Sequence, residues 1–460
     1  MRSPDTAMVR AASIRPLLVK EFWGVITGRA LWTMLLILCP LVGYSFFQAV
    51  SLYGEASAAA RDAPALATGL SPLDGVLVPT FGAFYLAVTL LFPFVAIRAL
   101  GREKETGALR LLVQLPYPVP TLIAAKMAAV MVAWLISVIP ALSALVLWRA
   151  FGGHLYVLET GNLLLGHLLY GLLVAAIALA AASIAESSAT AAIITLAVTI
   201  GSWVLDFALA GQTGILDWLS RLSLTQTLRT FEQGLLPAGL VLGMAAAIGG
   251  FATLAGIWLH PGVSLRAKLL RSILCVAAVA FVFALAATTT RTSLDLTEDQ
   301  RNSFSPADQR ALPNLRGRLD ITVRLAPEDP RYTDLRRSVL AKLERTLPNV
   351  RIRLAAGQSL IGSTSEASYG DVEYSYAGRS ARGPSTNERE ILPLIYELAG
   401  VPVPAPASGA DYPGYPLVAN ASAALVWFLG GLPVLIGTAW WLSSRAPRTF
   451  LKPVEPGGVS

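Results

Sequence analysis

The sequence is poor in charged residues, which make up only 14% of its 460 residues. An ordinary soluble chain carries about 25%. Histidine and cysteine are scarcer still, with three and two residues. Cys39 and Cys275 both lie in apolar runs and have no spacing typical of a disulfide or a metal site. Hydrophobic residues reach 54%, so much of the chain is expected to lie in an apolar environment rather than in water.

Motifs of the common catalytic and nucleotide-binding sites are also absent. No G-x-x-x-x-G-K-[ST] phosphate loop is present, since neither Lys-Ser nor Lys-Thr follows Gly107. H-E-x-x-H, G-x-S-x-G and C-x-x-C are missing as well, and the three histidines are scattered. We therefore predict that the chain is not an enzyme and that it binds no metal, cofactor or ATP itself.

Long apolar runs are abundant instead. Eight stretches with almost no charge have the length of about 20 residues that crosses a bilayer as a helix. They cover 31–50, 77–97, 127–148, 162–184, 188–208, 236–258, 272–290 and 420–443. Lipid offers no partner to open backbone groups, so each is expected to be helical. A buried core helix is the alternative for any one of them, but eight such runs favour a polytopic α-helical membrane protein.

Positive charge beside the runs predicts their orientation, because Lys and Arg collect on the cytoplasmic side. Sixteen lie before the first run, between the second and third, between the sixth and seventh, or after the eighth: Arg2, Arg10, Arg15, Lys20, Arg29, Arg98, Arg102, Lys104, Arg110, Lys126, Arg266, Lys268, Arg271, Arg445, Arg448 and Lys452. The opposite short loops hold four: Arg61, Arg149, Arg221 and Arg229. We predict a multi-pass protein of the bacterial cytoplasmic (inner) membrane with both termini in the cytoplasm. The net charge of +7 follows from this bias, so no nucleic-acid partner is expected.

The order of the runs divides the chain into modules. The predicted divisions are a cytoplasmic N-terminus with an interfacial helix (1–30), a six-helix module (31–260), a basic linker with the seventh span (261–290), an extracytoplasmic domain (291–418), the eighth span (419–443) and a cytoplasmic tail (444–460). Long domains are translocated largely regardless of charge, so the domain between the last two spans can lie outside.

This outer segment has the pattern of a small soluble α/β domain. Alternating apolar and polar residues predict strands at 318–326, 349–355 and 371–378. Leucine and valine at four-residue steps predict an amphipathic helix over 332–347. The expected order is strand, helix, strand, strand, helix.

Helix-capping residues predict two further helix starts in the same segment. Ser385 and Glu388 have capping-box spacing at the start of a helix that Gly400 would end. Ser305 before Pro306 is a favourable first-turn pair for another helix.

The most unusual segment of the chain is GREKETGALRLLVQLPYPVPTLIAAK, between the second and third spans. Its first ten residues, from Gly101, carry five charges. An amphipathic stretch, Ala108–Gln114, and three prolines follow. A cytoplasmic segment of this kind offers a soluble partner charges of both signs. Because the segment adjoins two spans, a movement of the bound partner could be transmitted to the membrane helices.

This segment resembles the one between the second and third spans of ABC-2-type permeases. Those commonly show an acidic pair, Gly-Thr, a Leu-rich helix, a Pro-containing turn and a Lys opening the next span. Glu103 and Glu105 match the acidic positions and Gly107 matches the glycine, whereas Ala108 replaces the usual threonine. The resemblance implies that Arg102, Glu103, Glu105 and Gly107 face a separately encoded ABC ATPase subunit, which would use the ATP.

Other stretches resemble further parts of known transporters. Residues 14–29 are similar to the interfacial helix that precedes span one in these permeases, and 216–236 to the short amphipathic helices between spans five and six. Residues 294–327 and 369–400 resemble the exported domain of the gliding-motility-type ABC auxiliary subunit. The chain is therefore expected to be a permease fused to that subunit. It would act as a homodimer or with a second permease in membrane lipid, on an unidentified substrate.

Several alternatives stay open at this point. Asp206 is the one charged residue within the spans, and it is either a substrate-path residue or a residue at the outer interface. The whole chain could instead be a membrane scaffold or assembly factor that presents an extracytoplasmic recognition domain and needs no ATPase. A secondary transporter is a third possibility, but it should show buried ionisable residues and inverted repeats.

Overall fold

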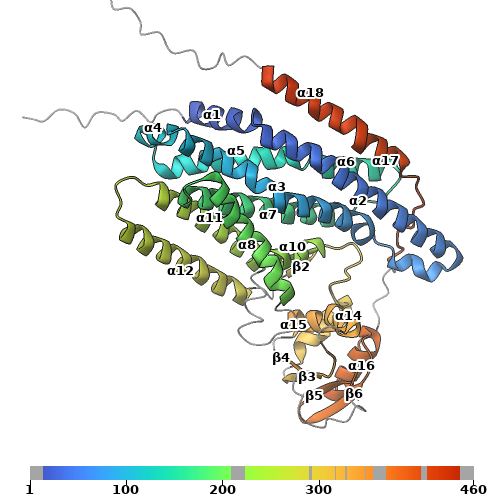
Figure 1. Ribbon diagram of the computed structural model, residues 1–460. Helices are drawn as coiled ribbons and strands as arrows, with labels where there is room; N and C mark the ends of the chain where they lie inside the picture. Colours follow the sequence, from blue (N-terminus) through green and yellow to red (C-terminus); the bar gives the residue numbers. More distant parts are fainter. Residues whose placement is uncertain are drawn as a thin grey trace, which may run out of the picture.

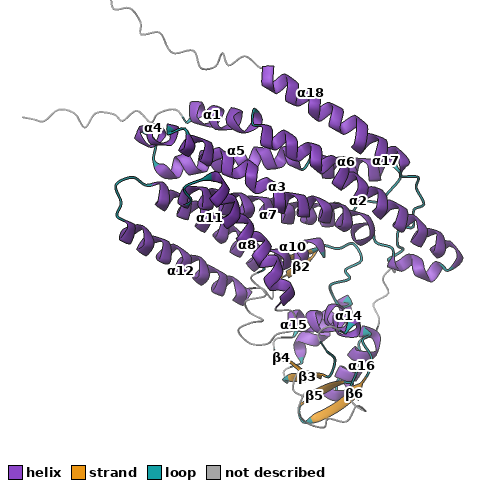
Figure 2. Cartoon of the chain, in the orientation of Figure 1, coloured by secondary structure: helices purple, strands orange, loops and turns teal. Residues whose placement is uncertain are grey.

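The computed structural model describes residues 14–208, 223–289, 293–315, 317–326, 329–347, 349–355, 369–405 and 412–445. Long helices lie side by side in a bundle, and a small sheet-containing region lies beyond one end of it (Figures 1 and 2). Within these residues, seven helices are long and apolar enough to cross a membrane. They correspond to seven of the eight predicted spans. The run at 188–208 forms a helix with a shorter apolar part, Ser188–Val204, so its crossing stays a prediction.

The described part of the N-terminal region, up to Leu259, is mostly helical. Its helices are α1 (Arg15–Ile26), α2 (Arg29–Asp62), the short η1 (Pro64–Gly69) and η2 (Leu73–Leu77), α3 (Val78–Glu105), α4 (Ala108–Gln114), α5 (Val119–Ser137), α6 (Ile139–Ala150), α7 (Val157–Ile184), α8 (Ser188–Ala208), α10 (Leu224–Glu232) and α11 (Ala238–Leu259). α7 is the most buried of the candidate spans, and its alanine-rich stretch allows α3 and α11 to approach closely.

Three helices differ from the sequence predictions. α3 continues past residue 97 to Glu105, so the charged residues after Gly101 lie on a helix and not in a loop. The run at 127–148 is broken at Val138, because Pro140 has no amide hydrogen and its ring opposes helix continuation. α12 (Leu265–Thr289) begins at Leu265 rather than at 272. The basic residues predicted for a linker therefore lie in its first turns.

The last two apolar helices lie on opposite flanks of the bundle (Figure 1). α12 packs on α11, where a Cβ added at Gly250 would lie 2.4 Å from Val279 Cγ2. α17 (Ser422–Val426), η7 (Trp427–Gly431) and α18 (Leu432–Arg445) pack on α2. There a Cβ at Gly43 would lie 2.3 Å from Phe428 Cβ. Both contacts depend on glycines that let a large side chain lie against the neighbouring helix.

The outer segment contains a four-stranded sheet in the order β4-β3-β5-β6. Its strands are β3 (Leu319–Val323), β4 (Val350–Leu354), β5 (Val372–Tyr376) and β6 (Arg379–Gly383). β3 and β4 are parallel and are connected through α14 (Pro330–Leu335), η4 (Arg336–Leu340) and α15 (Ala341–Thr346). β5 is antiparallel to both β3 and β6. α16 (Glu388–Ala399) packs against β5 and β6, while α13 (Pro306–Ala311) and η3 (Leu312–Asn314) precede the sheet.

The three predicted strands and the helix over 332–347 are confirmed, but β6 was missed because its residues, RSARG, show no apolar alternation. The predicted capping box is wrong. Asn387, not Ser385, is the N-cap of α16, and its side chain accepts from the Arg389 amide. The C-cap is confirmed, since Gly400 has a left-handed φ of +69°. The Ser305 cap is also confirmed: its hydroxyl oxygen accepts from the Asp308 amide.

Candidate functional site

The charged segment forms a helical corner where α3 ends and α4 begins. α3 stops there because Gly107 takes a φ of +75°, which glycine adopts without strain. The second helix, α4, has the bounds that the sequence predicted, and none of its residues is fully buried. Arg102 and Gly107 are exposed at this corner, and Leu111 on α4 is 69% exposed. Residues 102–115 are called the α3–α4 corner below.

Four charged side chains lie beneath the corner: Lys20 and Glu21 of α1, Glu103 of α3 and Lys126 of α5. Lys126 is only 1% exposed. Its Nζ lies 3.0 Å from both carboxylate oxygens of Glu21 and 2.5 Å from Glu103 Oε2. It also donates to the Ala99 carbonyl oxygen at 2.8 Å. These partners offset the cost of burying the charge, and we call the four residues the inner ion cluster.

Lys20 completes the cluster from its more exposed side. It pairs with Glu21 at 3.1 Å and with Glu103. Burial alone would lower the pKa of Lys20, but the hydrogen bond to Glu103 and the charge of Glu21 outweigh burial and raise it. The cluster thereby joins three helices that are distant in sequence, α1, α3 and α5.

Sequence reasoning did not place Lys20, Glu21 or Lys126 in a cluster. It counted both lysines among the cytoplasmic flanking charges and did not consider Glu21. The buried residues of α1 are Leu17, Glu21 and Val25. The four-residue spacing of these three positions was the available signal, since it puts the carboxylate on the apolar face.

The opposite side of the α3 end contacts the turn between α7 and α8. Lys104 Nζ donates to the carbonyl oxygens of Ser183, at 3.1 Å, and Ala185, where α7 ends. A cation is favourable at such a position, because the last carbonyl groups of a helix lack amide partners. Ser188, the first residue of α8, donates from Oγ to Glu105 Oε1 at 2.5 Å. The end of α3 is thus tied to α7 and α8 on this side.

The structure therefore separates the four residues that the sequence grouped. Glu103 points into the inner ion cluster and Glu105 toward α8, while Arg102 and Gly107 remain on the surface. Asp206 belongs to α8, but its side chain lies outside the described residues. The predicted interfacial helix exists as α1. Part of the predicted 216–236 segment is described, and it contains α10.

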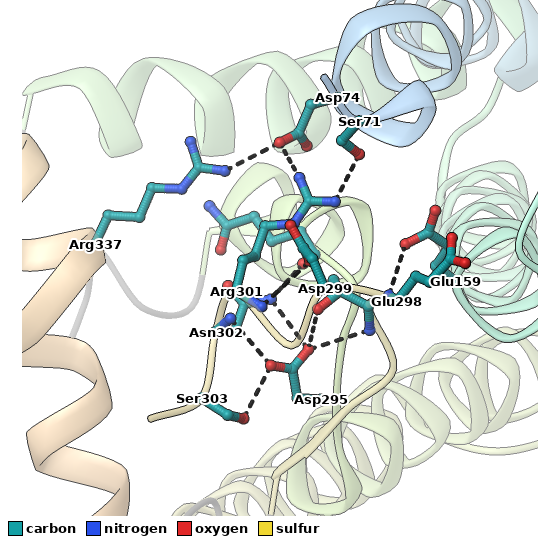
Figure 3. Close-up of polar contacts among 12 residues, drawn as sticks. Ser71, Asp74, Glu159, Asp295, Glu298, Asp299, Arg301, Asn302, Ser303 and Arg337 are labelled. Carbon is teal, nitrogen blue, oxygen red and sulfur yellow. Dashed lines mark hydrogen bonds and ion pairs between the residues drawn. The ribbon is translucent and has the colours of Figure 1, made fainter. Parts of the chain in front are cut away.

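A second polar cluster lies at the other end of the bundle, where the outer segment meets it (Figure 3). Here β2 (Ser293–Asp295) pairs antiparallel with β1 (Leu235–Pro237), which lies between α10 and α11. Arg301 pairs with Asp74 of η2 and with Asp299 at 2.9 Å, and it donates to Ser71 Oγ at 2.6 Å. Arg337 of η4 reaches the same Asp74 at 3.5 Å.

Glu298 makes the second group of contacts at this end. Its carboxylate lies 2.8 Å from His154 Nε2 and accepts from the Tyr415 hydroxyl at 2.6 Å. Its amide donates to Glu159 Oε2 at 3.3 Å. The hydrogen bond to Glu298 raises the pKa of Tyr415 to about 12. The rings of His154 and Tyr415 stack with 3.6 Å between their centroids. We call the residues contacting Arg301 and Glu298, with those two, the outer polar cluster.

Neither cluster has the arrangement of a catalytic centre. Among the described residues, no group of three or more His, Cys, Asp or Glu side chains could hold a metal ion. The side chains at both ends are engaged in ion pairs and hydrogen bonds between helices or between modules. These contacts hold the helices and the sheet-containing region in their relative positions.

Comparison with known proteins gives a family match in the helical region. Residues 15–231 match the family model described as ABC-2 family transporter protein. No match was found among curated proteins or among solved structures. The match runs from α1 to α10, so it contains the inner ion cluster and the α3–α4 corner. It does not reach the outer sheet, so the resemblance to an auxiliary subunit stays a prediction. Residues 15–231 of this multi-pass membrane protein are thus similar to the ABC-2 family transporter proteins, and this similarity supports a role in transport across the membrane.

Proposed function

We propose that the chain is the permease subunit of an ATP-driven ABC-2-type transporter in the bacterial cytoplasmic membrane. The family match and the seven candidate spans support this role. Because the sequence has no phosphate loop, the ATP would be hydrolysed by a separately encoded ATPase. Two copies of the chain, or one copy and a second permease, would pair with two such ATPase subunits. The substrate and the direction of transport are open.

The observation that carries this proposal is an exposed corner directly above a buried ion cluster. One side of the corner faces inward, where Val113, together with Tyr117 just after the corner, packs against Leu17 of α1 and Leu122 of α5. The other side presents Leu111 and Leu115, 69% and 46% exposed, near charged residues. Exposed apolar residues rimmed by charges are typical of a protein interface. This surface is where we propose that the ATPase binds.

The contacts beneath the corner suggest how a movement of the bound ATPase would be transmitted to the membrane helices. Glu103 connects the end of α3 to α1 and α5 through Lys126 and Lys20. Lys104 and Glu105 connect the same helix end to α7 and α8. Separating a buried charge from its partner costs about 3–5 kcal/mol. Helices joined in this way are expected to move with the corner and not to slide past it.

The proposed topology keeps both termini and the α3–α4 corner in the cytoplasm and the domain at 291–418 outside. The sixteen-to-four distribution of Lys and Arg supports it. The fold is consistent with it, because β2 is hydrogen-bonded to β1 at the end of the bundle away from the corner. Asp206, toward the C-terminal end of α8, remains a proposed substrate-path residue.

Affinity purification of the tagged full-length chain from its native membrane tests this function. In mild detergent, we expect a phosphate-loop ATPase to co-purify at a ratio near one to one. Arg102→Glu combined with Arg110→Glu should remove the ATPase, because both side chains are exposed at the corner. Arg61→Glu, an exposed arginine at the end of α2 away from the corner, is the matched control and should retain it. Recovery of envelope proteins without any ATPase would contradict the proposal and favour a membrane scaffold.

A further inference from the structure

A cavity of 560 Å³ lies inside the helices, apart from both polar clusters. Its walls come from α7, α8, α10, α11 and α12. Its volume falls within the range of about 300–1,000 Å³ that is usual for small-molecule sites. It is several times the cavity of about 150 Å³ that holds one benzene molecule. The space is therefore large enough for a flexible ligand with many carbon atoms.

The lining is apolar except at one end. Three hydroxyl side chains, Ser202, Ser223 and Thr227, gather where α8 approaches the start of α10. The Leu224 amide donates to Ser202 Oγ at 2.8 Å, which holds these two helices together there. At the other end the lining residues include Ile177 and Leu254, near the ends of α7 and α11. A ligand that fits this lining has a long apolar part and a polar group at one end.

The cavity has lining residues on α8 and α12 that other parts of the chain do not cover. Val198 of α8 and Val276 of α12 both line it, and they are 40% and 57% exposed. α12 is also the least buried of the candidate spans in the described part of the chain. Because these helices belong to a membrane protein, the hydrocarbon of the bilayer is the medium that can reach these residues.

From this geometry we propose that the cavity binds one apolar chain of a membrane amphipath. The chain enters laterally between α8 and α12, and its polar group lies near Ser202 and Thr227. An apolar cavity does not fill with water, and its lining atoms lose dispersion contacts when it is empty. The amphipath is either a bilayer phospholipid or a transported molecule of the same build. The site is independent of the proposed ATP-driven function, because a chain can enter whether or not an ATPase is bound.

Two glycines provide a matched pair of variants. Gly201 lines the cavity, and no atom lies within 4 Å of a Cβ added there. Gly201→Phe therefore fills the cavity without displacing a neighbour at its Cβ, and it replaces a poor helix former. Gly249 on α11 has the same free space around an added Cβ, but it is exposed and is not part of the lining. Gly249→Phe is thus the control for the substitution itself.

The test uses the full chain in nanodiscs that contain phosphatidylcholine with a photoactivatable diazirine in one acyl chain. After illumination, mass spectrometry maps the labelled residues. We expect label on partly exposed lining residues such as Phe251 of α11. Gly201→Phe should reduce this label about tenfold, equivalent to about 1.4 kcal/mol of binding free energy. Gly249→Phe should leave it unchanged. No label at Phe251, or equal label in Gly201→Phe, would overturn the proposal.

Mass spectrometry of lipids that co-purify from the native membrane separates the two sources. Loss of common phospholipids in Gly201→Phe, in the proportions of the membrane, would identify a resident bilayer lipid. Loss of one amphipath that is enriched relative to the membrane would identify a selected ligand. Identical lipids in wild type and Gly201→Phe would contradict the site. Co-purification of the ATPase, measured in the same samples, reports separately on the proposed function.

Discussion

The two ends of the bundle both carry clustered charges, but they hold them in different surroundings. At the inner ion cluster, the side chains of Lys126 and Glu21 are 2% and 4% exposed. At the outer polar cluster, the side chains of Arg301 and Asp74 are 17% and 42% exposed. The inner cluster joins helices of one module, whereas the outer one joins two modules. The comparison indicates that the inner ion cluster holds α1, α3 and α5 together as one rigid unit. The outer polar cluster is a docking contact between the two modules, and breaking it should require less free energy.

The largest expected effect is a loss of coupling between ATP hydrolysis and transport, and it should occur in variants at the inner end but not at the outer end. Glu103→Ala with Glu105→Ala should uncouple ATP hydrolysis from transport while the protein stays in the membrane, because the contacts of Glu103 with Lys20 and Lys126 and of Glu105 with Ser188 are lost. Transport per ATP hydrolysed, measured in proteoliposomes with the partner ATPase, checks this. The matched pair at the outer end, Asp74→Ala with Glu298→Ala, should retain coupling. Unchanged coupling in the inner pair would contradict the proposed rigid unit at the inner end.

The next largest effect concerns stability. Lys126→Ala leaves Glu21 and Glu103 without their buried cation, and it should cost about 3–5 kcal/mol of unfolding free energy. A thiol-reactive dye that reports exposure of the fully buried Cys39 follows thermal unfolding, in a Cys275→Ala background.

The control for this variant is Lys20→Ala, because the Lys20 side chain is 40% exposed. A partly exposed ion pair is worth about 1 kcal/mol or less, so this change should be mild. Equal losses in the two variants would show that burial does not distinguish the members of the inner ion cluster.

A pH effect is expected from Glu232, a partly buried residue of α10 near Arg229 whose Oε1 lies 3.9 Å from His167 Nε2. Burial raises its pKa to about 7, from an ordinary value of 4.5, although Arg229 opposes the shift. Between these pH values the folded protein retains a proton that the unfolded chain has lost. Stability should therefore fall as pH rises through this window, by at most roughly 3 kcal/mol. Unfolding temperatures from pH 5 to pH 8 measure the slope, and Glu232→Gln should flatten it. An equally steep slope in that variant would assign the pH dependence to other groups.

The smallest effect is expected at the outer polar cluster. Arg301→Ala removes contacts to Asp74 and Ser71 and should cost about 1–3 kcal/mol, as for hydrogen bonds to charged groups. Amide hydrogen exchange should become faster in 293–303 but remain unchanged near Lys126. Arg382→Ala, at an exposed ion pair within the outer sheet, is the control and should change neither region. Faster exchange at both ends of the bundle would contradict a separable docking contact.

The sequence predicted the long helices and the bounds of α4 because their signals are local. Apolar runs of sufficient length specify membrane helices, and Gly107 with the following prolines marks both ends of α4. The strands β3, β4 and β5 were predictable for the same reason, since alternation is read along one segment.

The inner ion cluster could not be predicted in this way. Lys126 lies far along the chain from Glu21, and only the tertiary fold brings them within 3.0 Å. A charge beside an apolar run is ordinarily placed in water, so sequence reasoning put Lys126 at the membrane surface. It also assigned Glu103 to a partner protein, whereas the structure pairs it with two lysines of its own chain.

Site-specific photocrosslinking tests the central claim most directly. A benzophenone amino acid replaces Leu111 on the α3–α4 corner or, as the matched control, Leu66 in η1 at the other end, which is 57% exposed. After illumination of native membranes, the account predicts that the Leu111 position crosslinks to a phosphate-loop ATPase and that the Leu66 position does not. The absence of an ATPase adduct at Leu111, or an equal adduct at both positions, would contradict the account.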